Sequence, residues 1–164
     1  MTTTGLTLGA LALASGEAER VRPRWRDVPL GLAIAGGLFA VFQAGDRVAR
    51  QAMPRGDAQI KEIYALREIR PKEEIAARLA TIIGPAEELF WRGWLQRRIG
   101  WLPAAAAYGG AHLVTGNATL IGAASVAGLY WGALRALGAP MGALIVSHSV
   151  WDIWIFLVQP TERE

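Results

Sequence analysis

Two adjacent carboxylates, Glu87 and Glu88, and one guanidinium, Arg92, lie within the otherwise apolar stretch G-P-A-E-E-L-F-W-R-G-W-L-Q-R-R that runs from Gly84 to Arg98. In a helix, Glu88 and Arg92 lie one turn apart on the same face, and Glu87 is rotated by about 100° from Glu88. We therefore expect Arg92 to neutralise Glu88 and to leave Glu87 free. Charged groups at bilayer depth cost roughly 2.5–3.5 kcal/mol each, so they usually face the protein interior and mark a functional site. The alternative is an interfacial helix with a surface ion pair.

The chain has two histidines, His112 and His148, and both lie in apolar runs. Each has a polar residue one helical turn away, Tyr108 before His112 and Asp152 after His148. A single histidine in an apolar helix is more often a packing residue than a catalyst. Here three apolar segments carry ionisable groups, and each group would need its own partner in hydrocarbon. We therefore expect these groups to converge on one site.

Such a cluster suits hydrolysis by activated water. A partly desolvated carboxylate accepts a proton from water, an imidazole relays it, and a second imidazole donates to the oxyanion. Serine catalysis is less favoured, because Ser147 and Ser149 adjoin His148 in sequence and so point away from it on a helix. Alternatively, Glu87, His112 and His148 can bind Zn²⁺, since two imidazoles and a carboxylate form a known catalytic zinc shell. The H-E-x-x-H spacing is absent, so the zinc hypothesis depends on residue type alone.

Composition indicates a membrane protein. The 164-residue chain is 52% hydrophobic with a mean hydropathy of +0.26, and its charged residues are crowded into a few segments. The net charge of +3 comes largely from arginines beside apolar runs, a placement typical of charge that sets topology and binds headgroups. The sequence contains no basic soluble module of the kind that binds nucleic acid. The absence of cysteine excludes disulfides, thiolate zinc sites and a cysteine nucleophile.

The charge pattern divides the chain into a basic N-terminal segment (1–27), a transmembrane anchor (28–44), a polar loop (45–73), a catalytic membrane core (74–158) and a tail (159–164). Apolar or helical runs over Val28–Ala44, Glu74–Ile99, Leu102–Thr115, Ala118–Leu137 and Met141–Val158 predict about five membrane segments. In the polar loop, Ile60, Ile63, Tyr64 and Ile69 recur near helical spacing, which predicts an amphipathic helix on the membrane surface. The expected fold is all-α, a polytopic membrane helical bundle of about five transmembrane segments with a short interfacial amphipathic helix.

Two further features predict how these segments position the site. Gly84-Pro85 predicts a kink directly before the carboxylates, where freed backbone groups can bind water or substrate. Small residues recur four apart at Ala124, Gly128 and Gly132, and such faces let membrane helices approach closely.

At these residues the sequence resembles the CPBP family of intramembrane proteases, also called the ABI family, which comprises CAAX prenyl proteases and bacteriocin-processing proteins. The family pattern is E-E-x-x-x-R, then F-x-x-x-H, then H-x-x-x-N or H-x-x-x-D, on successive membrane helices. The matching residues, in this order over about residues 74–158, are Glu87-Glu88 with Arg92, Tyr108 with His112, and His148 with Asp152.

The resemblance implies roles for these residues. Glu87 would activate water together with His112, Glu88 and Arg92 would fix the site, and His148 with Asp152 would lie on the oxyanion side. Tyr108 stands where the family usually has Phe; with Trp91 and Trp151 it is a candidate for substrate contact. Asp152 stands where many members have Asn. An ionised Asp cannot donate to an oxyanion, so Asp152 either orients His148 or is protonated.

The function that the resemblance implies is an intramembrane endopeptidase that hydrolyses a membrane-anchored or lipidated protein or peptide, in CAAX-type or C-terminal sorting-signal processing. Its expected location is the bacterial inner membrane, as a multi-pass protein whose partners are the substrate and the lipid bilayer and not nucleic acid. Zn²⁺ is the one candidate cofactor, because the resemblance leaves a metal-dependent and a glutamate mechanism open. Two alternatives remain: an inactive scaffold or immunity-type member of the same family, and proton or ion transport, for which no inverted repeat is visible.

Overall fold

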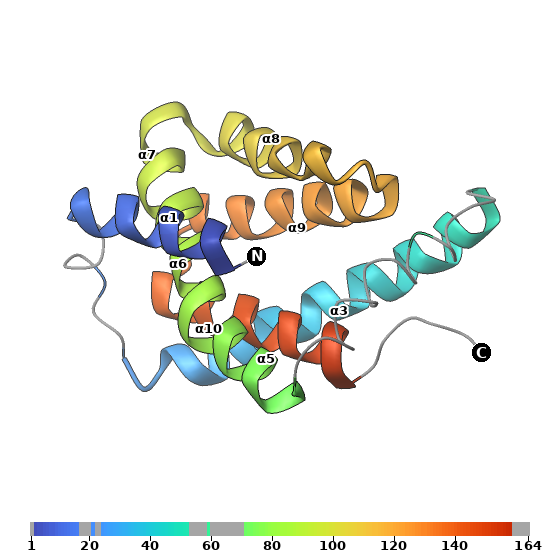
Figure 1. Ribbon diagram of the computed structural model, residues 1–164, viewed down its shortest axis with the longest axis horizontal. Coiled ribbons are helices and arrows are strands. Elements are labelled where there is room, and N and C mark those ends of the chain that lie inside the picture. The colour runs from blue at the N-terminus through green and yellow to red at the C-terminus, as the bar shows by residue number, and fades with distance from the viewer. Residues whose placement is uncertain (1, 17–20, 22–23, 53–58, 60–70, 159–164) are drawn as a thin grey trace.

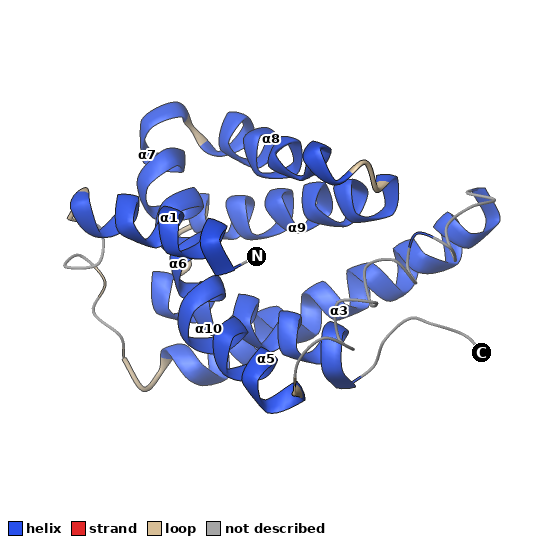
Figure 2. Cartoon of the chain, viewed as in Figure 1, coloured by secondary structure: helices blue, strands red, loops and turns tan. Residues whose placement is uncertain are grey.

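The computed structural model describes residues 2–16, 21, 24–52, 59 and 71–158, and this part of the chain contains helices and no strand (Figure 2). The predicted all-α class is confirmed. The α-helices are α1 (Thr2–Ala14), α3 (Asp27–Ala52), α5 (Lys72–Arg78), α6 (Gly84–Glu88), α7 (Gln96–Ile99), α8 (Trp101–Ala111), α9 (Ala118–Ala136) and α10 (Met141–Ile153). The amphipathic helix predicted over residues 60–69 lies outside the described residues.

The helices form two packed pairs with a third helical segment beside them (Figure 1). α8 packs on α9, and α3 packs on α10. The α3–α10 pair is parallel, because Asp27 lies beside Gly142 at one end and Phe42 packs on Trp151 at the other. The segment 72–99, which carries the two glutamates, packs against α10 on one side and α1 on another. This placement brings the glutamates next to the helix that carries His148.

Segment 72–99 is helical from end to end but is not a regular α-helix. Its backbone widens into π-helical turns at Leu79–Ile83 and Leu89–Leu95, on either side of α6. Pro85 has no N–H, and in a regular helix its ring would press on the carbonyl of Thr81, so the wider turn before it relieves this clash. The segment ends at Gly100, whose φ of 87° suits glycine. The kink predicted at Gly84-Pro85 stays a prediction, and what the backbone shows directly before these residues is a π-helical turn, a feature frequent at functional sites.

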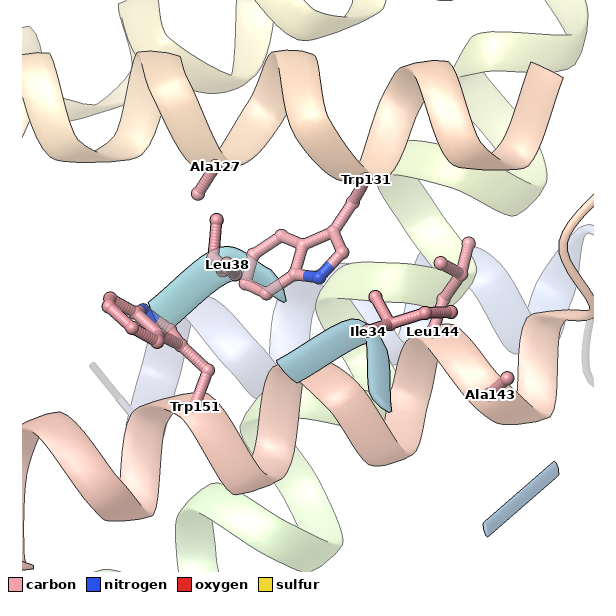
Figure 3. Packing of buried hydrophobic residues seen from close by; sticks show 7 residues of the cluster. All are labelled: Ile34, Leu38, Ala127, Trp131, Ala143, Leu144 and Trp151. Atoms are coloured by element: carbon pink, nitrogen blue, oxygen red, sulfur yellow. The ribbon is translucent and has the colours of Figure 1, made fainter. Parts of the chain in front are cut away.

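A hydrophobic cluster joins the α3–α10 pair to α9 (Figure 3). Its buried members are Ile34, Leu38, Ala127, Trp131, Ala143, Leu144 and Trp151. Full burial of each large side chain contributes about 1.5–3 kcal/mol. Trp151, predicted to contact substrate, lies in this cluster with its ring 4.5 Å from that of Phe42. This placement favours a packing role for Trp151 over the predicted substrate contact.

Two of the described helices are long and apolar enough to cross a membrane, at Asp27–Gly45 and Met141–Val158. They agree with the first and last of the predicted spans. The total of five membrane segments stays a prediction, since the other helices do not pass this test of length and apolarity.

Glycines allow close helix contacts where the sequence predicted them. A methyl group on Gly128 would lie 3.0 Å from the Tyr108 ring, and one on Gly109 would overlap the hydroxyl of Ser125. These contacts join α8 to α9. At Gly84 an added methyl group would lie 2.5 Å from Ser149 Oγ and 3.1 Å from the carbonyl oxygen of Leu79. Gly84 therefore sets the approach of the glutamate segment to α10.

We expect Gly84→Ala to lower the free energy of unfolding by about 1–3 kcal/mol, because overpacking at this contact separates the two helices. Gly110→Ala is the matched control, since an added methyl group there meets nothing within 4 Å. Its helix propensity should make it neutral or stabilising by up to about 1 kcal/mol. Chemical unfolding in detergent measures both. Equal stability of the two variants would contradict the proposed close approach.

Candidate active site

Glu88 is the centre of a buried charged network between segment 72–99 and α10. Its side chain has no exposed surface, and its Oε1 atom accepts hydrogen bonds from Arg92 Nη1 at 2.9 Å and from His148 Nδ1 at 2.7 Å. A carboxylate paired with Arg only accepts hydrogen bonds, so the proton in the second bond belongs to His148 Nδ1. The predicted pairing of Glu88 with Arg92 is confirmed. The contact with His148 joins residues 60 positions apart.

The other ring nitrogen of His148 faces two carboxylates. His148 Nε2 lies 3.8 Å from Glu87 Oε2 and 3.5 Å from Asp152 Oδ2. The Glu87 and Asp152 side chains are 18% and 14% exposed, whereas His148 is almost completely buried. The separation from Glu87 is too long for a direct hydrogen bond and short enough for one water to contact both groups. The more accessible side of the cluster is therefore the side on which Glu87 and Asp152 lie.

Trp131 holds the His148 ring from α9, and sequence reasoning missed it. The two rings stack with centroids 4.2 Å apart at 22°, and Trp131 Nε1 donates a hydrogen bond to Ser147 Oγ at 3.0 Å. Trp131 also lies under the Arg92 guanidinium, 5.1 Å from the ring centroid, within the range of cation–π attraction. In the sequence, a tryptophan between Gly128 and Gly132 of an apolar helix suggests only packing.

We expect Ser147→Ala to lower the free energy of unfolding by about 1–3 kcal/mol, because it leaves the buried N–H of Trp131 without an acceptor. Ser125→Ala is the matched control. Ser125 bonds the carbonyl of Ile121 in its own helix, so its loss should change stability by less than about 0.5 kcal/mol. Thermal unfolding of both variants tests this. A control as unstable as Ser147→Ala would contradict the role of the Trp131 bond.

α8 contributes the Tyr108 ring to the cluster. Tyr108 is 5% exposed, and the Arg92 guanidinium lies 4.4 Å above its ring centroid. Its ring meets those of His112 and His148 edge-on at 5.2 and 6.5 Å, and Trp91 packs against it at 5.4 Å. Tyr108 and Trp91 thus form a wall beside the charged network, and their substrate contact stays a prediction.

His112 lies at the end of the apolar helix that carries Tyr108. It lies just after α8, at the start of the 3-10 turn His112–Thr115, and its Nδ1 is 2.9 Å from the carbonyl oxygen of Tyr108. Among the described residues, His112 forms no ion pair with a carboxylate, and the imidazole beside Glu87 belongs to His148. The partnership of Glu87 with His112 stays a prediction, and the structure adds His148 as an imidazole close to Glu87.

Three buried polar atoms have no hydrogen-bond partner among the described residues: Glu88 Oε2, Arg92 Nη2 and Gln96 Oε1. Gln96 Nε2 donates to the carbonyl of Gly132 at 2.9 Å and so joins the glutamate segment to α9. Unpaired buried atoms of charged groups are costly, and ordered water is the usual way to satisfy them. The orphan atoms of Glu88 and Arg92 thus indicate bound water within the charged network.

The zinc alternative stays a prediction. In the part of the chain that the structure describes, no three His, Cys, Asp or Glu side chains are grouped so as to hold a metal ion. The proposed ligand set of Glu87, His112 and His148 is therefore not assembled. The structure does bring a carboxylate and an imidazole to a distance that one water can bridge. This is the arrangement of groups used for hydrolysis by activated water.

The comparison with known protein families places this site in a class of membrane-embedded proteases. Residues 75–154 match the family model described as Rce1-like, type II CAAX prenyl endopeptidase Rce1-like. Every side chain of the charged network lies within this match. The resemblance to the CPBP family inferred from the motifs is therefore confirmed over these residues. No curated protein and no solved structure matches the chain.

Proposed function

We propose that the protein is a multi-pass intramembrane endopeptidase that hydrolyses a peptide bond in a lipidated or membrane-anchored substrate with a water activated by Glu87. The observation that supports this proposal most directly is the distance of 3.8 Å between Glu87 Oε2 and Nε2 of the buried His148 ring. The match to the Rce1-like family model also supports a CAAX-type protease activity.

Glu87 is the group best suited to act as the base. Glu88 is bound by Arg92 and His148, so taking up a proton would neutralise the carboxylate and weaken two buried hydrogen bonds. Glu87 is partly exposed and, among the described residues, forms no ion pair with an arginine, so its carboxylate is available to accept a proton from water. In this scheme Glu88 and Arg92 are positioning residues, which hold the His148 ring through Nδ1.

The reaction is a hydrolysis and consumes one water. Glu87 accepts a proton as the water oxygen bonds to the amide carbon, and the C–N bond then breaks. The proton returns to the departing nitrogen, which leaves one product with a carboxylate and one with a free amine. The Nε2–H of a doubly protonated His148, or a protonated Asp152, would donate to the oxyanion, since both groups face the accessible side of the site.

A second function is favoured by a different observation. The Glu88–Arg92–His148 network is buried and also joins segment 72–99 to α10, so the same residues would serve an inactive scaffold or an immunity-type protein. The two functions differ in what they require of Glu87, which lies outside the buried hydrogen bonds. A scaffold needs the network for stability and does not need a base on the accessible side.

The direct test uses the full chain in proteoliposomes. The family name indicates the probe, a farnesylated peptide with a CAAX-type C-terminus, tested beside the same peptide without the lipid. We expect release of a C-terminal fragment, detected by mass spectrometry, from the lipidated peptide. If no lipidated or membrane-anchored peptide is cut, and Glu87→Gln and His148→Ala both retain full function in cells, the protein is a scaffold.

A further inference from the structure

A polar cavity lies away from the active site, at the end of the molecule where α3 and α10 begin. It has a volume of about 500 Å³. Its lining residues are Val21, Arg24, Arg26, Asp27, Leu30, Arg135, Pro140, Met141 and Gly142. Three guanidinium groups and one carboxylate thus face the same space. A volume of this size suits a small ligand or a headgroup.

The charges in this cavity favour an anion. Asp27 is 6% exposed, and its Oδ2 atom accepts a hydrogen bond from the backbone N–H of Arg24 at 3.0 Å. Arg135 donates one hydrogen bond to the carbonyl of Ala139, and Arg26 lies 5.6 Å from the Trp25 ring. Within the described part of the chain, none of the three guanidinium groups forms an ion pair with a carboxylate. Their remaining N–H donors are available to a phosphate, which arginine binds in a bidentate manner.

The cavity lies at the end of the two candidate spans, where the edge of the membrane is expected. α3 and α10 run parallel from this end (Figure 1), and both candidate spans begin here, at Asp27 and Met141. Trp25 next to the cavity is 79% exposed, as expected for an aromatic anchor at the headgroup level. Leu30 and Met141 line the same cavity beside the arginines. A lining that contains both basic and apolar residues fits a phosphate attached to acyl chains better than free phosphate.

We propose that this cavity binds the phosphate headgroup of an anionic phospholipid through Arg24, Arg26 and Arg135. The proposal rests on the membrane placement in the proposed function and is independent of peptide hydrolysis. The bound lipid would join the start of α3 to the loop between α9 and α10. Since α10 carries His148, the site would hold one end of the helix that bears the imidazole.

The test compares two lipids on the full chain. Protein in detergent is mixed with equal amounts of phosphatidylglycerol and phosphatidylcholine, and native mass spectrometry measures the ratio of the retained lipids. We expect the wild type to retain phosphatidylglycerol preferentially, and Arg135→Gln to lower that preference about fivefold, the factor for one arginine near a membrane surface. The double variant Arg24→Gln with Arg26→Gln should lower it further. Arg135→Lys keeps the charge and should keep most of the preference.

Arg98→Gln is the matched control for surface charge. Arg98 is exposed and stacks on Trp94 outside the cavity, so its loss should leave the lipid preference unchanged. An equal effect of Arg98→Gln, or no preference in the wild type, would overturn the proposal. So would arginine-dependent binding of inorganic phosphate without a preference for phosphatidylglycerol, because the source would then be soluble. Glu87→Gln should retain lipid as the wild type does, so failure of the hydrolysis proposal leaves this test intact.

Discussion

Glu87→Gln should lower the rate of peptide cleavage by about 10²–10⁴-fold, the usual contribution of a general base. Gln has nearly the same size as Glu and cannot accept a proton from water. The change should leave the fold intact, because the Glu87 side chain is partly exposed and makes no direct hydrogen bond to His148. We therefore expect the free energy of unfolding to change by less than about 1 kcal/mol. Cleavage rates in proteoliposomes and chemical unfolding in detergent measure the two quantities.

Glu73→Gln is the matched control for this prediction. Glu73 lies in the first turn of α5, within the same helical segment, and it is exposed. Its replacement should change neither cleavage nor stability. A Glu87→Gln variant that cleaves at the rate of this control would remove Glu87 as the base.

Arg92→Met should lower the free energy of unfolding by about 3–5 kcal/mol, because it leaves the Glu88 carboxylate buried without its cation. Arg92 is 2% exposed and Glu88 is fully buried, so bulk solvent does not screen the carboxylate that remains. The change also removes the guanidinium from the faces of Tyr108 and Trp131. Thermal and chemical unfolding should both register the loss, together with lower cleavage.

The pair of Glu74 and Arg78 provides a control of the same spacing. These residues are also four apart, with 2.6 Å between Arg78 Nη2 and Glu74 Oε1, but their side chains are 36% and 31% exposed. Arg78→Met should therefore cost less than about 1 kcal/mol. In addition, Glu88→Gln should restore part of the stability lost in Arg92→Met, as a double-mutant cycle would show. Equal losses from Arg92→Met and Arg78→Met would contradict the buried network.

Local spacing was sufficient to predict part of the site. Glu88 and Arg92 lie four residues apart in a helix, so their contact follows from helical periodicity alone. The same holds for His148 and Asp152 in α10. By contrast, the bond between Glu88 and His148 joins two separate helices, and only the convergence argument and the family resemblance indicated that they meet.

Other features depend on packing that the sequence does not encode locally. α8 ends at Ala111, so the backbone at His112 is already a 3-10 turn, which the apolar run alone does not indicate. Trp131 stacks on His148 because α9 approaches α10, and neither its type nor its neighbours distinguish it from a packing residue. Trp151 lies in a motif rich in candidate site residues, yet it faces α3 and packs on Phe42. In each case tertiary contacts decide the role.

The most direct test of the central claim is a single-turnover cleavage of the lipidated peptide in ¹⁸O-labelled water, with the intact mass of the protein followed during the reaction. If a water activated by Glu87 attacks the amide, the new product carboxylate carries ¹⁸O at first release, and the protein never gains the mass of a peptide fragment. A covalent peptide on the protein would instead indicate a nucleophilic side chain and would contradict the mechanism proposed for Glu87 and His148.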